Sequence, residues 1–444
     1  MERLSCVHGR KALQAPTGGR VAQDRKTSAM EDVAVIGGGI IGVTIAAYLA
    51  EAGRKVLVID RSGICEETSA GNAGALAFAD VLPLAQKGMA RQVPGWLADP
   101  LGPLSIPPVY LPTILPWLLR FLRAGRASGY EAALCAQATM MRLAEREWAG
   151  LTARSATTRM LREDGCLELY ESEAEFEAAQ AGWRARRRFH IAFQHLQKGE
   201  LAAYQPGLSD RFVRATFVPG WKTVTDPHRL GQAIWAHAES NGARFLPATV
   251  SSVRREAEGI VLQLAGGERR VCGKLVIAAG AWSKRFAAQF GDAVPLETER
   301  GYNTTLPVGA FPVERQLVFG RHGFVVTPLE TGLRIGGAVE LGGLKRPPNY
   351  ARSKAMLDKA ASFLPGLKTE GGRQWMGYRP SMPDSLPVIG PSSRDPDVIL
   401  AFGHGHLGLT QAAGTGRLVR DLVSGQAPSI DITPFRPQRF KGWF

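Results

Sequence analysis

Apolar and polar positions divide the chain into segments with two different periods. The apolar run Val33–Ile36 leads into a glycine-rich turn, an apolar helical stretch and a second apolar run, Lys55–Asp60. A short apolar run bounded by turn residues is typical of a buried strand, and the stretch between the two runs is long enough for a helix. The pattern therefore predicts a β-α-β unit in this part of the chain.

Helical and strand periods alternate through the rest of the sequence. The segments with a helical period are 131–154, 172–197 and 227–241. The segments with a strand pattern are 165–170, 243–256, 271–279 and the alternating region 296–380. A hairpin turn is expected at Gly266–Gly267, and the frequent turns of the last region favour an antiparallel sheet.

This order predicts two discontinuous domains, because the segments typical of a dinucleotide-binding domain lie on both sides of the segments that would form a second, antiparallel domain. We expect a dinucleotide-binding domain at 31–105, 222–291 and 385–430, a substrate domain at 106–221 and 292–384, and a tail at 431–444. A cleft between two such domains is the natural place for a substrate. Residues 1–30 contain neither an apolar signal segment nor a regular period, so we expect a disordered extension or a translation start at Met30.

Composition narrows the class of protein. The cysteines are Cys6, Cys65, Cys135, Cys166 and Cys272. Their odd number and wide spacing predict neither a disulfide framework nor a metal site, and they favour a reducing, cytoplasmic compartment. The net charge of +14 includes the cluster Arg184–Arg188, which lies in a polar helical stretch without interleaved exposed aromatic residues. We therefore expect a solvated helix face and no binding of nucleic acid.

One uncharged segment approaches the length of a membrane span. Residues 101–119 carry no charge, but their prolines at 103, 107, 108, 112 and 116 exclude an ordinary spanning helix. The residues Pro116–Arg123 form an amphipathic pattern with basic flanks, which can pack on the protein or lie on a lipid surface. A peripheral position on the inner membrane face is therefore the alternative to a purely cytoplasmic protein.

The turn after the first strand carries the first candidate chemistry. Gly37, Gly39 and Gly42 form the pattern that lets a backbone approach a pyrophosphate at a helix N-terminus, and Asp60 closes the second strand. A carboxylate at that position can accept hydrogen bonds from ribose hydroxyls. The pattern predicts an adenine dinucleotide site and leaves NAD and FAD as alternatives.

A second glycine-rich turn favours FAD. The apolar strand Asp397–Phe402 runs into Gly403, Gly405 and Gly408 and then into a helix, but no further β-α-β unit follows. The simplest explanation is a second helix N-terminus directed at another part of the same cofactor. A flavin uses such positive potential, because it stabilises the anionic reduced ring.

Five motifs resemble those of the D-amino-acid dehydrogenase small-subunit group. They are the fingerprint with Asp60, the segments 67–74 and 276–283, the segment 375–384 with its Gly377-Tyr-Arg379-Pro380 motif, and Gly403-His-Gly405. This group lies in a larger family of FAD-dependent amino-acid oxidoreductases that includes glycine and sarcosine oxidases, and the resemblance spans about Asp32 to Gly425. It implies an α/β fold, with a glutathione-reductase-type FAD-binding Rossmann domain and a discontinuous antiparallel-sheet substrate domain.

The resemblance also implies which residues bind the cofactor. The residues expected at the ADP half are Gly37, Gly39, Gly42 and Asp60, with Val250 offering backbone contacts near the adenine. The residues expected along the flavin are Thr68, Ser69, Asn72 and Ala73, and the further cofactor candidates are Ile40, Ile41, Arg61, Gly74, Ala279 and Gly280. The residues expected at the flavin pyrimidine end are Gly403, His404, Gly405, Gly408, Leu409 and Thr410.

Three residues are the candidate catalytic groups. In the family that the chain resembles, the arginine matching Arg379 pairs with the carboxylate of the amino acid, and a planar guanidinium suits this geometry. Tyr302 is a candidate for a second hydrogen bond to that carboxylate, and its alternative is a core aromatic residue. We expect His404 close to the flavin and His406 as a structural residue of the loop.

The resemblance implies oxidative deamination of a D-amino acid to a 2-oxo acid and ammonia. Hydride would leave Cα for flavin N5, and a quinone, a membrane-surface acceptor or another acceptor would take the electrons. The alternatives are an enzyme for D-proline, D-hydroxyproline, sarcosine or glycine, or a noncatalytic flavoprotein subunit, against which Arg379 argues. The oligomeric state stays open.

Overall fold

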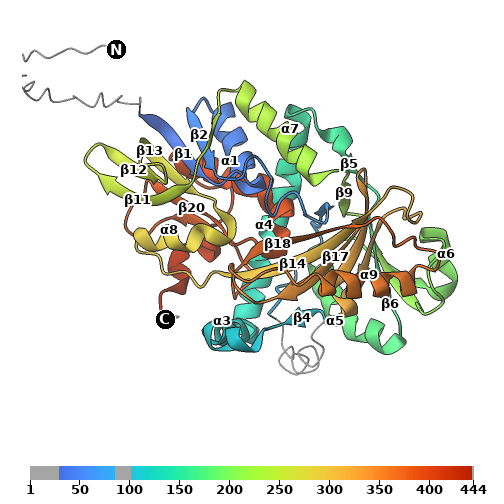
Figure 1. Cartoon of the computed structure of the whole chain (residues 1–444). Helices are drawn as coiled ribbons and strands as arrows, with labels where there is room; N and C mark the ends of the chain where they lie inside the picture. The colour runs from blue at the N-terminus through green and yellow to red at the C-terminus, as the bar shows by residue number, and fades with distance from the viewer. Residues whose placement is uncertain (1–29, 86–101, 443–444) are drawn as a thin grey trace, which may run out of the picture.

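Two β-sheets that lie side by side organise the protein (Figure 1). The computed structural model describes residues 30–85 and 102–442. The extension and the alternative start that we predicted for 1–30 therefore fall almost entirely outside the described residues. In the described ranges, one sheet has eight strands and the other has nine, and a small three-stranded sheet joins them.

The eight-stranded sheet has a parallel centre. Its parallel strands are β10 (Arg244–Pro247), β2 (Val56–Asp60), β1 (Glu31–Ile36), β13 (Arg269–Ile277) and β20 (Val398–Phe402). Its antiparallel strands are β12 (Gly259–Leu264), β11 (Val250–Glu256) and β19 (Val388–Pro391). The predicted β-α-β unit and the hairpin at Gly266–Gly267 are confirmed.

Both faces of this sheet are covered, which explains why its central strands are apolar throughout. Side chains alternate along β1, so Val33 and Val35 face one core and Ala34 and Ile36 face another. The helices of the first face are α1 (Ile40–Glu51), α7 (Pro227–Ser240) and α10 (Gly408–Val423). The other face is covered by the β11–β12 hairpin and α8 (Ser283–Gln289).

The long helix α4 (Ala127–Arg154) packs on this first layer of helices. Its Trp148 indole donates a hydrogen bond to the Thr410 carbonyl at 2.9 Å, and its Ala144 meets Gly414 of α10. The segment 106–221 was assigned to the substrate domain, yet this helix contributes to the core of the dinucleotide-type sheet. The domain boundaries remain a prediction. Among the segments assigned to the substrate domain, α4 agrees least with its assignment.

The nine-stranded sheet is mostly antiparallel. Its strand order begins with β18 (Arg373–Ser381), β14 (Glu297–Leu306), β17 (Gly332–Glu340), β16 (Phe324–Leu329) and β15 (Gln316–Phe319). It continues with β6 (Cys166–Tyr170), β8 (Arg214–Val218) and β7 (Gln194–Gln197), while β4 (Leu104–Ser105) pairs with β17. The antiparallel strands predicted within 296–380 are confirmed, but residues 351–363 of this region form a helix that the prediction did not contain.

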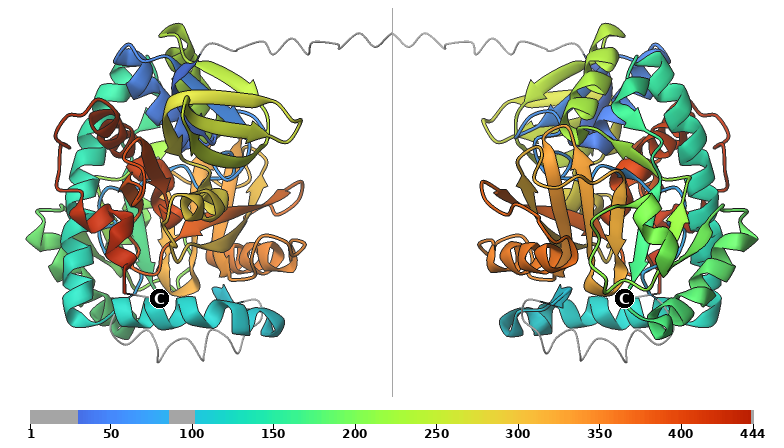
Figure 2. Two further views of the ribbon diagram at one scale, coloured as in Figure 1. Left: turned by 90° about the vertical axis from the view of Figure 1, so that its left-hand side faces the viewer. Right: turned by 90° about the vertical axis from the view of Figure 1, so that its right-hand side faces the viewer.

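The remaining elements surround the second sheet. The helices are α3 (Leu111–Ala124), α5 (Glu173–Arg188), α6 (Leu201–Tyr204) and α9 (Ala351–Phe363). The small connecting sheet consists of β3 (Ala75–Leu76), β9 (Lys222–Val224) and β5 (Leu161–Arg162). Figure 2 shows α3 lying across one end of the molecule.

Three predicted elements have different limits in the structure. The helix predicted over 172–197 ends at Arg188, because the chain turns at His190, where φ is +61°, and then forms β7. The strand predicted over 243–256 is divided into β10 and β11. The helix predicted at Pro116–Arg123 begins earlier, at Leu111, with Pro112 in its first turn, where proline costs no hydrogen bond.

Candidate active site

A cavity of about 540 Å³ lies where the two sheets meet. Its walls come from the turn after β1, the segment that follows β2, the turn after β13, the strands β14, β17 and β18, and the loop after β20. The carboxyl ends of parallel strands converge here, which is where open α/β sheets bind ligands. The tertiary structure thus brings most of the residues singled out from the sequence to one cavity.

The first glycine turn brings α1 close to the sheet. Gly37 has a φ of +115°, and a Cβ at this position would lie 2.3 Å from the Ala278 carbonyl oxygen. A Cβ on Gly42 would lie 1.9 Å from the Gly37 carbonyl oxygen. The Ile40 amide, at the start of α1, donates to the Ser69 hydroxyl at 3.0 Å. The helix start thus borders the cavity, and the Ser69 hydroxyl lies on its first amide.

The Asp60 carboxylate stands beside this turn. One oxygen accepts a hydrogen bond from the Gly38 amide at 2.8 Å, and the other accepts from the Ser62 amide at 2.8 Å. A carboxylate has more lone pairs than these two bonds use, so it can accept further hydrogen bonds from a ligand. Arg61 follows it, and its guanidinium lies 4.2 Å from the centre of the Trp282 ring, a cation–π contact.

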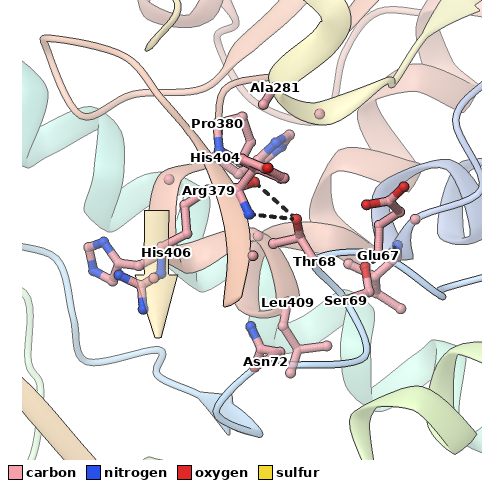
Figure 3. Close-up of a pocket in the computed structure, with 18 of the residues that line it drawn as sticks. Glu67, Thr68, Ser69, Asn72, Ala281, Arg379, Pro380, His404, His406 and Leu409 are labelled. Atoms are coloured by element: carbon pink, nitrogen blue, oxygen red, sulfur yellow. Dashed lines mark hydrogen bonds between the residues drawn. The ribbon is translucent and has the colours of Figure 1, made fainter. Parts of the chain in front are cut away.

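The segment that follows β2 is held against the second sheet. The Thr68 hydroxyl donates to the Tyr378 carbonyl at 3.0 Å and accepts from the Tyr378 amide at 3.3 Å, as the dashed lines in Figure 3 show. The Asn303 amide donates to the Gly71 carbonyl at 2.9 Å. Arg334 donates to the carbonyls of Ala70 and Asn72. These bonds fix a wall of the cavity.

The loop after β20 supplies the second helix start. Gly403 has a φ of +86°, and a Cβ at this position would lie 2.7 Å from the Cγ of Met382. The imidazole of His404 is buried, and its Nε2 lies 2.9 Å from the Thr415 hydroxyl. Burial lowers the pKa of His404 to about 3, so the ring is neutral near pH 7. Its Nδ1 has no hydrogen-bond partner in the described ranges.

Arg379 reaches from β18 across β14 to β17. Its Nη1 donates to the Ala338 carbonyl at 3.1 Å, and its Nη2 lies 3.4 Å from the Gly337 carbonyl. The guanidinium lies directly over Gly301, where a Cβ would approach its Cζ to 2.4 Å. Burial lowers the pKa of Arg379, opposed by the charge of Glu299, but an arginine stays protonated. It thus retains donors for a carboxylate.

The hydroxyl of Tyr302 already has two partners. It donates to the Glu340 carboxylate and accepts from the Asn349 amide at 3.1 Å. The Tyr302 side chain lines the cavity but is buried, and its burial favours the interpretation as a core aromatic residue. A hydrogen bond from Tyr302 to a substrate stays a prediction.

His406 lies at the cavity wall, away from α10. Its Nε2 is 3.2 Å from the Asp80 carboxylate, and Figure 3 shows the His406 ring extending toward the same side as Arg379. Burial raises the pKa of Asp80, but the hydrogen bond from His406 and the charges of His406 and Arg186 lower it below its usual value. Arg186, from the basic cluster, also stacks on Trp183, with 4.5 Å from its Cζ to the ring centre.

Most predicted residues line the cavity, and three do not. The predicted residues that line it are Gly37, Gly39, Ile40, Ile41, Asp60, Arg61, Thr68, Ser69, Asn72, Ala73, Val250, Ala279, Gly280, Tyr302, Arg379, His404, Gly405, Gly408, Leu409 and Thr410. Gly42, Gly74 and Gly403 lie outside the lining and fit close backbone packing instead. Their contact with the cofactor stays a prediction.

Several lining residues were missed by sequence reasoning. They are Glu67, Asp80, Trp221, Trp282, Arg285, Glu299, Asn303, Arg334, Trp375 and Tyr378. A period of two from Arg379 along β18 could have found Trp375, whereas the candidate Tyr302 on β14 is out of phase with Glu299 and Asn303. Glu299, Gly301 and Asn303 share one face of β14, and Trp375, Gly377 and Arg379 share one face of β18.

The residues at this cavity fit an FAD. Two helix starts, at Ile40 and at Gly408, border the same elongated space, and the glycines before them carry no side chain into it. The unpartnered Nδ1 of His404 adds a polar atom on the wall that a ligand can satisfy. In the part of the chain that the structure describes, no group of His, Cys, Asp or Glu could hold a metal ion.

Comparison with known proteins agrees with this geometry. A family model described as FAD dependent oxidoreductase matches residues 32–422. A D-amino-acid oxidase of Bradyrhizobium diazoefficiens is 34% identical over 415 residues, covering 92% of this chain and 98% of that protein. A D-amino acid dehydrogenase of Rhizobium johnstonii is 30% identical over 419 residues, covering 92% of this chain and 99% of that protein.

Solved structures share the fold. The glycine oxidase from Geobacillus kaustophilus has a TM-score of 0.71 at 24% identity, covering 92% of this chain and 98% of its own. The L-proline dehydrogenase from P. horikoshii has a TM-score of 0.72 at 21% identity, covering 93% and 98%. The family match, the sequence relatives and the cavity together show that this chain belongs to the DAO family of FAD-dependent oxidoreductases.

Proposed function

We propose that this FAD-dependent oxidoreductase converts a D-amino acid to its 2-oxo acid and ammonia. The observation that carries the proposal is the half-buried Arg379 guanidinium, which faces the cofactor-type cavity with donors to spare. The relatives named D-amino-acid oxidase and D-amino acid dehydrogenase support the substrate class.

The chain's own residues would bind and orient the substrate. Arg379 would hold the carboxylate in a bidentate ion pair, while its bonds to the carbonyls of Gly337 and Ala338 keep the guanidinium in place. This pose fixes Cα relative to the wall formed by Thr68 to Ala73, which itself is tied to β18. Bound FAD supplies the acceptor for the hydride that leaves Cα.

The two histidines of the loop would serve the structure of the site. His404 is neutral and held by Thr415, and His406 is held by Asp80. Neither arrangement requires a histidine to move a proton. Water released into the cavity can hydrolyse the imine product to the 2-oxo acid and ammonia.

An anaerobic titration tests the proposal. Holoenzyme mixed with D-alanine, D-phenylalanine and other D-amino acids should lose its oxidised-flavin absorbance and release ammonia, and the L-enantiomers should react far more slowly. Bleaching by D-proline or sarcosine without release of ammonia would instead identify a secondary amine as the substrate. Absence of bleaching by every amino acid in the panel would refute the proposal.

We further propose that α3 rests on an anionic membrane surface, where a quinone acts as electron acceptor. Its apolar stripe comprises Leu111, Leu115, Leu119 and Leu122, which are 46%, 48%, 58% and 47% exposed. Residues 102–130 contain three arginines and no acidic residue, which complements anionic lipid. No helix in the described ranges is long and apolar enough to cross a membrane.

Vesicle sedimentation tests this surface. Holoenzyme should sediment with vesicles of phosphatidylglycerol and phosphatidylcholine, and the double variant Leu115→Glu/Leu119→Glu should stay in the supernatant. Val308→Glu is the matched control, because Val308 is 76% exposed on a different part of the protein. A shift in oligomeric state without any change in sedimentation would assign the stripe to a second copy of the chain. Peroxide yield distinguishes oxygen from a quinone as acceptor.

A further inference from the structure

One face of the β14–β18 ladder is directed into the cavity and carries two opposite charges. The direct cross-strand pairs on this face are Glu299 with Arg379, Gly301 with Gly377, and Asn303 with Trp375, and all six residues line the cavity. Directly opposed side chains of an antiparallel pair lie close together. A carboxylate and a guanidinium therefore stand next to each other at the substrate end of the site.

The Glu299 carboxylate lies near the charge of Arg379 but accepts no hydrogen bond in the described ranges. Its residue is 6% exposed, and no residue in 30–85 or 102–442 donates a hydrogen bond to it or forms an ion pair with it. Arg379, its neighbour, directs its donors to the carbonyls of Gly337 and Ala338 instead. The Glu299 oxygens are not among the fully buried polar atoms, so they stay open to the cavity and can accept hydrogen bonds from a ligand that brings donors.

A zwitterion has the charge pattern that this pair would bind. If the substrate carboxylate lies at Arg379, its ammonium group is one carbon away and meets a carboxylate on the adjacent strand. Gly301, two residues from Glu299 on this face, has no side chain and so leaves room for the Arg379 guanidinium, which lies over it. The unpartnered Oδ1 of Asn303, also buried at the cavity wall, is a second acceptor on the same strand face.

We propose that Glu299 binds the α-ammonium group of the substrate and accepts one of its protons. This inference rests on the proposed function. An N–H bond of the ammonium breaks and an O–H bond forms on the Glu299 carboxyl, which leaves the neutral amine with its electron pair. That pair forms the C=N bond as hydride leaves Cα, so the two electrons removed from the substrate reach the FAD that the family uses.

The other titratable groups around the cavity are already engaged. The Tyr302 hydroxyl is bound to Glu340, His404 is held by Thr415, and His406 is held by Asp80. Glu299 differs from these groups because the described protein offers it no donor. It is therefore the group that a substrate ammonium can satisfy without breaking an existing bond.

Binding of two isosteric, unreactive ligands tests the recognition step. 2-Aminoisobutyrate is a zwitterion without a Cα hydrogen, and pivalate has a methyl group in place of the ammonium. Titration of holoenzyme, followed by the flavin absorption spectrum, should show tighter binding of 2-aminoisobutyrate. Glu299→Gln should weaken the binding of 2-aminoisobutyrate about ten- to a hundredfold, because one charge-assisted hydrogen bond is lost. The same variant should bind pivalate as tightly as the wild type or more tightly.

A matched control lies on the same strand. Glu297 precedes Glu299 by two residues, lies outside the cavity lining and accepts a hydrogen bond from the Tyr110 hydroxyl at 2.9 Å, which a glutamine can also accept. Glu297→Gln should bind both ligands as the wild type does. Equal effects of Glu299→Gln on the two ligands, or no effect on either, would overturn the inference.

The rate of flavin reduction tests the proton transfer. In Glu299→Gln the reduction rate constant divided by the substrate dissociation constant should rise about tenfold per pH unit below the pKa of the ammonium, because only free amine reacts. The wild type and Glu297→Gln should show a much shallower slope. Identical slopes in all three proteins would overturn the proton-transfer step.

A further variant separates this inference from the proposed function. Arg379→Met should weaken the binding of both 2-aminoisobutyrate and pivalate, because both ligands carry the carboxylate. If this variant binds both ligands like the wild type, the carboxylate site and the proposed function are wrong. If it loses both while Glu299→Gln changes neither, the function stands and the role of Glu299 is refuted.

Discussion

The replacement Gly301→Ala should displace Arg379 without unfolding the protein. A Cβ at Gly301 would lie 2.4 Å from the Arg379 Cζ and 2.4 Å from its Nη2, whereas ordinary contacts begin at 3.4 Å. The obstructing atoms belong to the end of a flexible side chain, so the guanidinium can move by about 1 Å while the sheet remains intact. Such a move lengthens its bonds to the carbonyls of Gly337 and Ala338, now 3.4 and 3.1 Å.

The expected magnitude follows from two opposing effects. Alanine in a strand interior is favoured over glycine by about 0.5–1 kcal/mol, and overpacking typically costs about 1–3 kcal/mol, so the net loss of stability should stay below about 2.5 kcal/mol. A displacement of about 1 Å at a binding group can cost about a hundredfold in catalysis. We therefore expect pivalate to bind ten- to a hundredfold more weakly, by about 1.4–2.7 kcal/mol.

Spectral titration with pivalate and a thermal melt measure both quantities. Gly266→Ala is the control, because Gly266 lies in the hairpin turn between β12 and β13 with no atom within 4 Å of an added Cβ. Retention of wild-type pivalate affinity by a folded, FAD-loaded Gly301→Ala protein would refute the placement of the carboxylate over this part of the sheet. Equal loss of affinity in the control would show that the assay reports general destabilisation.

Three further predictions concern the cofactor wall and the buried histidine. Gly71→Ala places a Cβ 2.3 Å from the Trp375 ring, so purified protein should contain less FAD per chain than wild type, which the ratio of flavin to protein absorbance measures. Thr68→Val removes both bonds to Tyr378 and should lower stability by about 1–2 kcal/mol in urea unfolding; an unchanged midpoint would contradict this role. The pKa of His404 is lowered to about 3 in the folded protein, so between pH 7 and pH 5 this imidazole takes up a proton in the unfolded chain only. The free energy of unfolding should therefore fall by about 2 kcal/mol over this range. His404→Gln should lack this part of the decline, and an identical pH dependence in both proteins would contradict it.

The sequence by itself predicted the parts of the fold that local chemistry controls. Gly37 has a positive φ, and Gly42 packs closely on the Gly37 carbonyl, which only glycine permits, so the residue types of this turn reveal its geometry. The runs Val33–Ile36 of β1, Val56–Ile59 of β2 and Val398–Phe402 of β20 are apolar because both of their faces are covered, and the sequence shows these runs directly. The strand–turn–helix order at both glycine turns, and the antiparallel strands within 296–380, followed from the same reasoning.

Only the tertiary structure decided which side chains meet. The partner of the Tyr302 hydroxyl is Glu340 on a neighbouring strand, and the lining face of β14 is defined by its register with β18. Strand register and helix packing depend on contacts between residues far apart in the chain, and a local period carries no record of them. For the same reason the motif that resembles the family predicted Arg379 as a carboxylate partner, but the sequence did not reveal Glu299 beside it or the packing of α4 on α1 and α10.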